Sequence, residues 1–157
     1  MDRHRLQNLI FFWFQFITLA IIFIGLMYIL VPAYELRLRR DYYGELVRTS
    51  WPYVIAVEDC YLQFGDLGRC NTGEFGIPPE ILPKQHYGAV YSLTVNKGEI
   101  VITPLAQYGI LPSDLYILSP ILLADKTMVW NVSGDGFLKG YARVRRVYNY
   151  YPYLRLI

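Results

Sequence analysis

The feature that most constrains this chain is an uncharged apolar stretch near its N-terminus. From Leu9 to Val31 there are 23 residues without a charged side chain, and the polar side chains inside the stretch are Gln15 and Thr18. As a helix, the stretch is about 35 Å long, enough to cross a hydrocarbon core of about 30 Å with some tilt. A buried helix of a soluble protein normally keeps a polar stripe, and this one has none. We therefore expect one transmembrane helix.

A cleaved secretory signal is the alternative interpretation of this stretch. The apolar run is longer than the core of a signal sequence, which is about 7–15 residues, and no small-residue cleavage site follows it.

Two signals bear on the orientation of the chain, and they disagree. Two arginines precede the helix and three follow it between residues 37 and 40, which slightly favours a cytoplasmic C-terminal part. Cys60 and Cys70 have the spacing of a local disulfide loop, which persists in an oxidising compartment such as the periplasm. A pair of free thiols is the alternative. We give the cysteines more weight and expect a periplasmic domain.

Composition and motifs favour a protein without catalytic or metal chemistry. The net charge of +2 is too small to indicate a nucleic-acid partner by itself. Two cysteines and two histidines would need carboxylates to complete a tetrahedral zinc site. No glycine-rich phosphate loop and no nucleophile motif is present. We expect no catalytic residue, no metal and no cofactor.

Helical spacing continues beyond the apolar stretch. Apolar and aromatic residues recur at helical spacing from Tyr34 to Tyr61, with charged residues between them. The pattern predicts one long helix from about residue 6 to about residue 62, whose second half is amphipathic and packs on a domain. Pro32 and Pro52 interrupt the run, and we expect each to kink the helix.

A turn-rich loop and then four strand signals follow the helix. Glycines and prolines are frequent in residues 63–88, which predicts irregular structure there. Runs of β-branched and aromatic residues predict strands at 89–95, 99–103, 115–118 and 127–132. Asn96-Lys97-Gly98 reads as a tight hairpin with glycine at a position of positive φ. Four antiparallel strands against one helix make an α+β domain.

A set of short strings occurs in order along the chain. The strings are Val31-Pro32-Ala33-Tyr34 with Pro52 twenty residues later, Ala56-Val57-Glu58-Asp59-Cys60, Gly65-Asp66-Leu67, Cys70-Asn71, Gly73, Gly76-Ile77-Pro78, Ser92-Leu93-Thr94-Val95 with Gly98 and Ile100, Leu118-Ser119-Pro120 and Trp130. This ordered set resembles the type IV pilins of the a class and their relatives, the minor pilins and pseudopilins. The resemblance covers about residues 11–136.

The resemblance implies a fold and a division of the chain. It implies a long N-terminal transmembrane spine helix packed on a four-stranded antiparallel sheet. Residues 1–10 would be a short basic leader-like segment, and residues 11–34 the transmembrane half of the spine. Residues 35–157 would be a periplasmic or extracellular domain with a loop at 63–88 and a basic, tyrosine-rich tail at 138–157.

Two positions depart from the pattern of the family. Family precursors are cut after a glycine just before a phenylalanine, and here Phe11 follows Ile10, whose bulk should resist the peptidase. Family members carry a glutamate at the fifth mature position, and here that position is Gln15. An uncut chain has no ammonium group at Phe11 to pair with a carboxylate, so a neutral amide suits the hydrocarbon better. The hypothesis is that the leader stays attached; an alignment slip of one residue is the alternative.

The C-terminal tail is the stretch with binding character. Arg143, Arg145 and Arg146 are interleaved with apolar residues and followed by tyrosines. Three interpretations stay open: an edge strand, a docking segment for a partner subunit, or a DNA contact through phosphate binding and base stacking. The C-terminal disulfide loop common in the family is missing, and the tail stands in that region.

The resemblance implies a non-enzymatic structural subunit of a type IV pilus or related secretion machine, reaching the cell surface in a filament. Ile10 and Gln15 favour an uncleaved accessory in the bacterial inner membrane that binds other envelope components. A DNA-uptake pilin is a third and weaker hypothesis, which salt-dependent DNA binding would identify.

Overall fold

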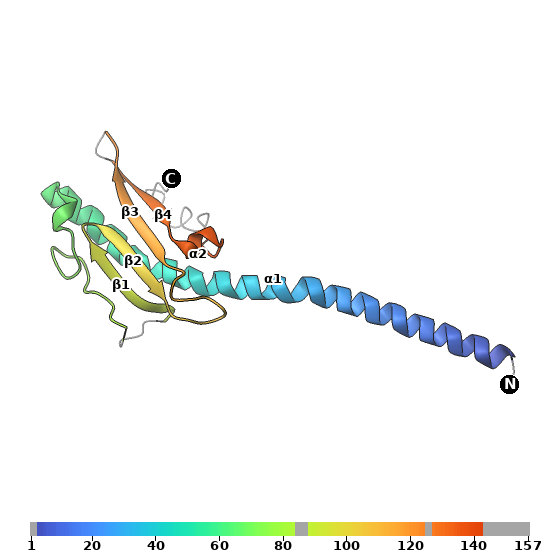
Figure 1. Cartoon of the computed structure of the whole chain (residues 1–157). Helices are drawn as coiled ribbons and strands as arrows, with labels where there is room; N and C mark the ends of the chain where they lie inside the picture. The colour runs from blue at the N-terminus through green and yellow to red at the C-terminus, as the bar shows by residue number, and fades with distance from the viewer. Residues whose placement is uncertain (1–2, 84–87, 125–126, 143–157) are drawn as a thin grey trace. The chain divides into compact units, whose positions relative to one another are not determined.

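The computed structural model describes residues 3–83, 88–124 and 127–142, with side chains from residue 11 onward. The chain divides into two compact units, residues 1–37 and 38–157. The described elements are helix α1 (Arg3–Phe64), the 3-10 helix η1 (Leu67–Arg69), strands β1 (Val90–Asn96), β2 (Glu99–Pro104), β3 (Tyr116–Leu122) and β4 (Met128–Ser133), and helix α2 (Asp135–Leu138) (Figure 1).

Helix α1 confirms the long helix predicted from the spacing of apolar residues, and its ends lie within about three residues of the expected ones. The helix includes both Pro32 and Pro52. The kinks expected at these prolines stay a prediction.

Within the second unit, α1 is amphipathic. One stripe is buried, at positions three or four residues apart, and the opposite face is exposed and charged. The buried stripe consists of Tyr43, Leu46, Val47, Ser50, Tyr53, Val54, Val57 and Cys60. Each large apolar side chain in such a stripe stabilises the fold by about 1.5–3 kcal/mol when it leaves water. This stripe is the helical half of the core.

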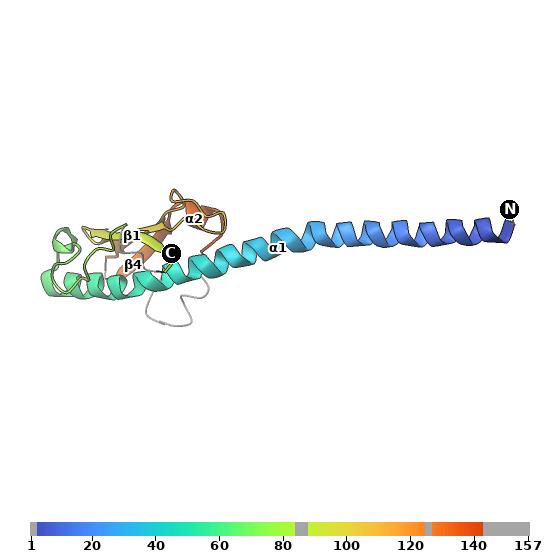
Figure 2. The same cartoon turned by 90° about the horizontal axis from the view of Figure 1, so that it is seen from below.

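The other half of the core comes from the sheet, whose described strands are antiparallel and follow the order β1-β2-β3-β4. Seen from two directions, the strands lie along one side of the second half of α1 (Figures 1 and 2). Side chains on the helix-facing side are buried, among them Leu93, Ile100, Ile102, Leu118 and Trp130. The predicted α+β class, with four antiparallel strands on a long helix, is confirmed and is consistent with the type IV pilin fold.

The turn between β1 and β2 confirms the predicted hairpin. Asn96 pairs with Glu99, so Lys97 and Gly98 form a two-residue loop. Their φ angles are +50° and +78°, which is the backbone of a type I′ turn. A side chain at Gly98 would press on Leu67 and Pro120 as well as strain the backbone, so this position requires glycine.

Strand β3 differs from the prediction, because it continues through Pro120 to Leu122 instead of ending at Leu118. The pairing of β3 with β2 ends at Leu118, so Pro120 lies where the β2 side needs no N–H donor. The chain can therefore keep proline inside a strand and extend the β3–β4 hairpin beyond β2. The short helices η1 and α2 were not predicted.

Tyr43 connects α1 to the loop before β3 and to the segment around α2. Its hydroxyl donates to the backbone oxygen of Asp114 at 3.0 Å, and its ring lies 6.0 Å from Tyr116 and 5.9 Å from Tyr141. Burial raises the pKa of the Tyr43 hydroxyl far above its usual range, so it remains a donor. Gly136 lies so close to the Tyr43 ring that a Cβ there would overlap it.

Gly136→Ala should therefore destabilise the domain by about 1–3 kcal/mol, the usual cost of overpacking. Gly44→Ala is the matched control, because its Cβ would meet no atom within 4 Å. In a helix interior alanine is favoured over glycine by about 1 kcal/mol, so this variant should be stabilised. Denaturant unfolding of the full chain in detergent, followed by tryptophan fluorescence, measures both. Equal midpoints would contradict the packing of Gly136 on Tyr43.

Trp130 ties β4 to the second half of α1. Its ring is fully buried, and its Nε1 donates to Glu58 Oε1 at 2.8 Å. Burial raises the pKa of the Glu58 carboxyl, the hydrogen bond from Trp130 opposes that rise, and Asp59 adds to it. The Glu58 carboxyl group therefore binds a proton more tightly in the folded domain than in the unfolded chain.

The raised pKa predicts a pH dependence. The stability contributed by protonated Glu58 is complete below its unfolded pKa near 4.5 and is lost as the pH rises through the folded pKa. Glu58→Gln keeps an acceptor for Trp130 without ionising, so it should be more stable than the wild type at pH 7 and lose that advantage toward pH 4. Denaturation midpoints of both proteins across this range measure the difference. An advantage that grows on acidification would contradict the assignment.

Candidate functional site

The candidate functional parts of this molecule are surfaces. In the described ranges, no group of three or more His, Cys, Asp or Glu side chains is arranged to hold a metal ion. The parts that matter are the apolar segment of the first unit and, in the second unit, the loops fastened to α1.

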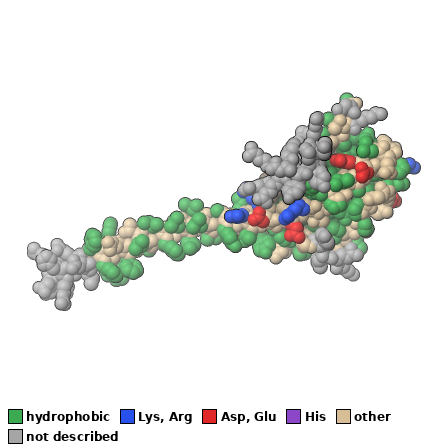
Figure 3. Space-filling view, turned by 180° about the vertical axis from the view of Figure 1, so that it is seen from behind, with side chains coloured by type: hydrophobic (Ala, Val, Ile, Leu, Met, Phe, Trp, Pro, Cys, Tyr) green, Lys and Arg blue, Asp and Glu red, His purple; other side chains and the backbone are tan. Residues whose placement is uncertain are grey.

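The apolar segment exposes almost all of its side chains. Every large apolar residue from Phe11 to Val31 is between 44% and 84% exposed. One 18-residue window within Phe11–Phe64 has a mean hydropathy of 2.5 and no buried residue, which is long and apolar enough to cross a membrane. Hydrophobic side chains cover the segment in the face shown in Figure 3. Among the residues that the structure describes, none buries this surface, which favours lipid or another apolar partner as its cover.

The polar side chains of the apolar segment are uncharged and are compatible with an apolar environment. The Thr18 hydroxyl donates to the backbone oxygen of Phe14 at 2.5 Å, so its hydrogen bond is made inside the helix. Gln15 is exposed on the helix surface and carries no charge. Phe11 and Pro32 also lie on this segment. At Ile10 the structure describes the helical backbone only.

In the second unit, polar side chains of α1 form hydrogen bonds to segments before, between and after the strands. The donors are long side chains that reach backbone oxygens, which satisfies carbonyl groups that no strand partner covers. The bonds are Arg39 Nε to Tyr108 O at 2.9 Å, Arg40 Nε to Gly140 O at 3.2 Å, Tyr42 OH to Leu105 O at 3.0 Å and Tyr53 OH to Pro79 O at 2.8 Å. Together with Tyr43, they place the loops along the helix.

An ion pair between a buried carboxylate and an exposed lysine completes this arrangement. Asp114 is fully buried, and its carboxylate accepts the backbone N–H of Leu111 at 3.0 Å and pairs with Lys139 Nζ at 2.5 Å. The hydrogen bond to Asp114 raises the pKa of Lys139. Because Lys139 follows α2 directly, the pair joins the loop before β3 to the end of that helix.

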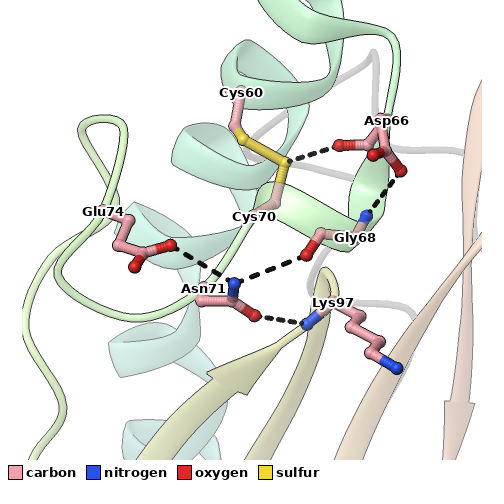
Figure 4. Close-up of a disulfide and its surroundings, with 7 residues drawn as sticks. All are labelled: Cys60, Asp66, Gly68, Cys70, Asn71, Glu74 and Lys97. Atoms are coloured by element: carbon pink, nitrogen blue, oxygen red, sulfur yellow. Dashed lines mark hydrogen bonds between the residues drawn. A yellow bond between two sulfur atoms is a disulfide. The ribbon is translucent and has the colours of Figure 1, made fainter.

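The disulfide joins α1 to the loop that follows it. Cys60 and Cys70 are bonded, fully buried and 6.0 Å apart at their Cα atoms. Beyond the bond, Asn71 Oδ1 accepts the N–H of Lys97 at 3.0 Å (Figure 4). The Gly98 N–H donates to the backbone oxygen of Cys70 at 2.9 Å. The disulfide loop is therefore held against the β1–β2 turn as well as against the helix.

Sequence reasoning identified the cysteines and missed the loop-fastening residues. Arg143, Arg145 and Arg146 lie outside the described residues. Pro52 lies in the second half of α1, between the buried Ser50 and Tyr53. The tyrosines at helical spacing could have indicated hydrogen bonds from the helix to the loops, because a buried tyrosine needs a partner for its hydroxyl. The sequence carried no sign of which carbonyl each would reach.

Removing the disulfide should destabilise the domain by about 2–3 kcal/mol, the chain-entropy value for a loop of this length. Replacing Cys60 and Cys70 together by alanine tests this in denaturant unfolding of the full chain. Limited proteolysis should then cut residues 65–77 first, because their remaining ties to the rest of the domain would be hydrogen bonds to β1 and to the β1–β2 turn. The wild type treated with reductant is the control and should match the variant. Unchanged midpoints in both would contradict a stabilising role for the bond.

No family model matches the chain. Over 94 residues it is 34% identical to a protein named "Prepilin peptidase-dependent protein D" from Escherichia coli (strain K12). The match covers 57% of this chain and 61% of that protein, so the chain spans about three fifths of the relative's length. At a coarse level, this similarity and the fold together support a pilin-like relationship and a structural, membrane-anchored role.

Proposed function

We propose that this chain is a non-enzymatic, pilin-like subunit anchored in a membrane by residues 11–34 and assembling with other pilin-like or envelope proteins. The observation that carries the proposal is the exposed apolar segment of α1. It continues directly into a helix that carries a folded α+β domain. A soluble enzyme or binding protein has no use for such a surface, whereas a membrane anchor and an assembly contact both require it.

The proposed location is the bacterial inner membrane, with a single span and residues 35–157 in the periplasm. The Cys60–Cys70 disulfide supports this orientation, because such bonds form and persist in oxidising compartments. The arginines between residues 37 and 40 oppose it under the positive-inside rule. Arg39 and Arg40 also bond to loop carbonyls, so their presence has a structural explanation besides topology.

Two forms of this function are distinguished by the first ten residues. A cleaved subunit would begin at Phe11 and could enter a filament of a type IV pilus or related secretion machine, which would take it to the cell surface. An uncleaved subunit would stay in the inner membrane as an accessory that binds other envelope components. Ile10 and Gln15 favour the uncleaved form, because a bulky residue precedes the cleavage position and a neutral amide needs no ammonium partner.

The intact mass of the native protein, measured in sheared surface filaments and in inner membranes, tests this function. We expect the protein in the membrane fraction with residues 1–10 still attached. Protein in the soluble periplasmic or cytoplasmic fraction would contradict membrane anchoring. A form that begins at Phe11 in the sheared fraction would show that Ile10 is tolerated and that the chain is a filament subunit.

The variant Ile10→Gly is the matched comparison, because it restores glycine before Phe11. It should increase cleavage strongly if the side chain at position 10 is what resists the peptidase. An unchanged mass in this variant would show that another feature prevents cleavage.

A further inference from the structure

The loop between β2 and β3 lies at the end of the domain that contains residues 39–43 of α1 (Figures 1 and 2). We call residues 105–113 of this loop the proximal loop. Arg39 Nε donates to the backbone oxygen of Tyr108 at 2.9 Å, and the Tyr42 hydroxyl donates to that of Leu105 at 3.0 Å. The Tyr42 and Tyr108 rings meet edge to face, with centroids 5.5 Å apart. The proximal loop is therefore fixed on the first turns of α1 in the domain.

The proximal loop carries no charged side chain, although most of it is exposed. Tyr108 is 49% exposed and Leu111 is 53% exposed. The other connections between α1 and β4, at residues 65–89, 97–98 and 123–127, each contain a charged residue. A loop with exposed aromatic and apolar side chains and no charge is better suited to a partly apolar environment than to water.

Tyr108 holds an unfavourable backbone conformation. Its φ is +53°, in a region that strains a bulky residue and that glycine adopts freely. Gly109 follows with a φ of +75°, and a Cβ there would lie 2.9 Å from an Arg39 guanidinium nitrogen. The close approach of Arg39 therefore explains Gly109. It does not explain why a half-exposed tyrosine precedes it, and a contact made by the exposed ring would.

The chain itself limits how far the proximal loop can lie from the membrane. The proposed anchor ends at residue 34, and Arg39, which holds the loop, is five residues later. That separation is about 8 Å in a helix and about 17 Å in a fully extended chain. The headgroup layer on each side of the hydrocarbon core is about 5–8 Å thick. The limit follows from sequence separation alone, so it holds for any orientation of the domain.

We propose that the proximal loop lies at the lipid–water interface, where Tyr108 and Leu111 contact phospholipid headgroups and the outer part of the acyl chains. Tyrosine is enriched at this depth, because its ring is apolar and its hydroxyl is polar. An uncharged loop enters this layer without removing an ion from water. The bilayer then holds the domain at a second place besides α1, which restricts its rotation about the helix. The inference rests on the proposed membrane anchoring and identifies the surface that the domain presents to the bilayer.

Tryptophan placed in the proximal loop tests the contact. The parent is the full-length Trp13→Phe variant, which retains Trp51 and Trp130 in the domain. It is reconstituted into phosphatidylcholine vesicles whose lipids are brominated on the acyl chain close to the headgroup. Adding Tyr108→Trp should produce a further loss of emission, up to the share of one tryptophan in three. Lipids brominated near the end of the acyl chain should quench the added tryptophan less, because the loop lies at the interface.

Phe75→Trp is the matched control. Phe75 is also a loop aromatic, 46% exposed with a φ of +47°. Its ring lies 4.5 Å from that of Phe64, which is 25 residues beyond Arg39 on α1, about 37 Å along the helix. This variant should show the same quenching as the parent. Leu111→Trp repeats the measurement at the other exposed apolar position of the proximal loop and should resemble Tyr108→Trp.

Each remaining outcome has a distinct meaning. Vesicle flotation reports anchoring separately, and the denaturation midpoint of each variant verifies that it is folded. No added quenching at either loop position, in protein that floats with the vesicles, would overturn the inference and leave the anchor intact. Equal added quenching at positions 75 and 108 would also overturn it, because the contact would not be specific to the proximal loop. Protein that does not float would reject membrane anchoring itself.

Discussion

The apolar side chains of α1 must be removed from water in both halves of the helix, but by different surroundings. The architecture of the rest of the molecule follows from this constraint. In the second half, the stripe from Tyr43 to Cys60 is covered by the sheet, and the opposite face is charged and exposed. In the first half, side chains from Phe11 to Val31 are exposed on all sides. A surface of that kind is stable in lipid or against other helices and costly in water. Fold and location are therefore two consequences of one sequence pattern.

The sheet alone would not determine how the loops lie on the helix. Buried tyrosines and partly buried arginines of α1 bond to the backbone oxygens of separate loops, and the disulfide adds a covalent tie at the end of the helix. Each neutral bond contributes about 1 kcal/mol, and together they restrict the conformations that the loops can adopt.

Local patterns in the sequence predicted much of the fold because their causes are local. The helix follows from spacing, and the turn was predicted from Gly98, whose φ is positive in the structure. The extension of β3 through Pro120 was missed because it depends on where β2 stops, which is a property of strand pairing. The Asp114–Lys139 ion pair was missed for the same reason, since the two residues are 25 positions apart and meet only in the folded domain.

The central claim is that the two halves of one helix have different surroundings. The first half is surrounded by lipid, and the second half packs on the protein core. The three tryptophans make this directly measurable, because Trp13 lies in the apolar segment while Trp51 and Trp130 lie in the domain. The full chain is reconstituted into vesicles of lipids brominated on their acyl chains. The double variant Trp51→Phe and Trp130→Phe, which retains Trp13, should be strongly quenched. The variant Trp13→Phe should keep nearly all of its fluorescence. Weak quenching of Trp13, or equal quenching in both variants, would contradict the account.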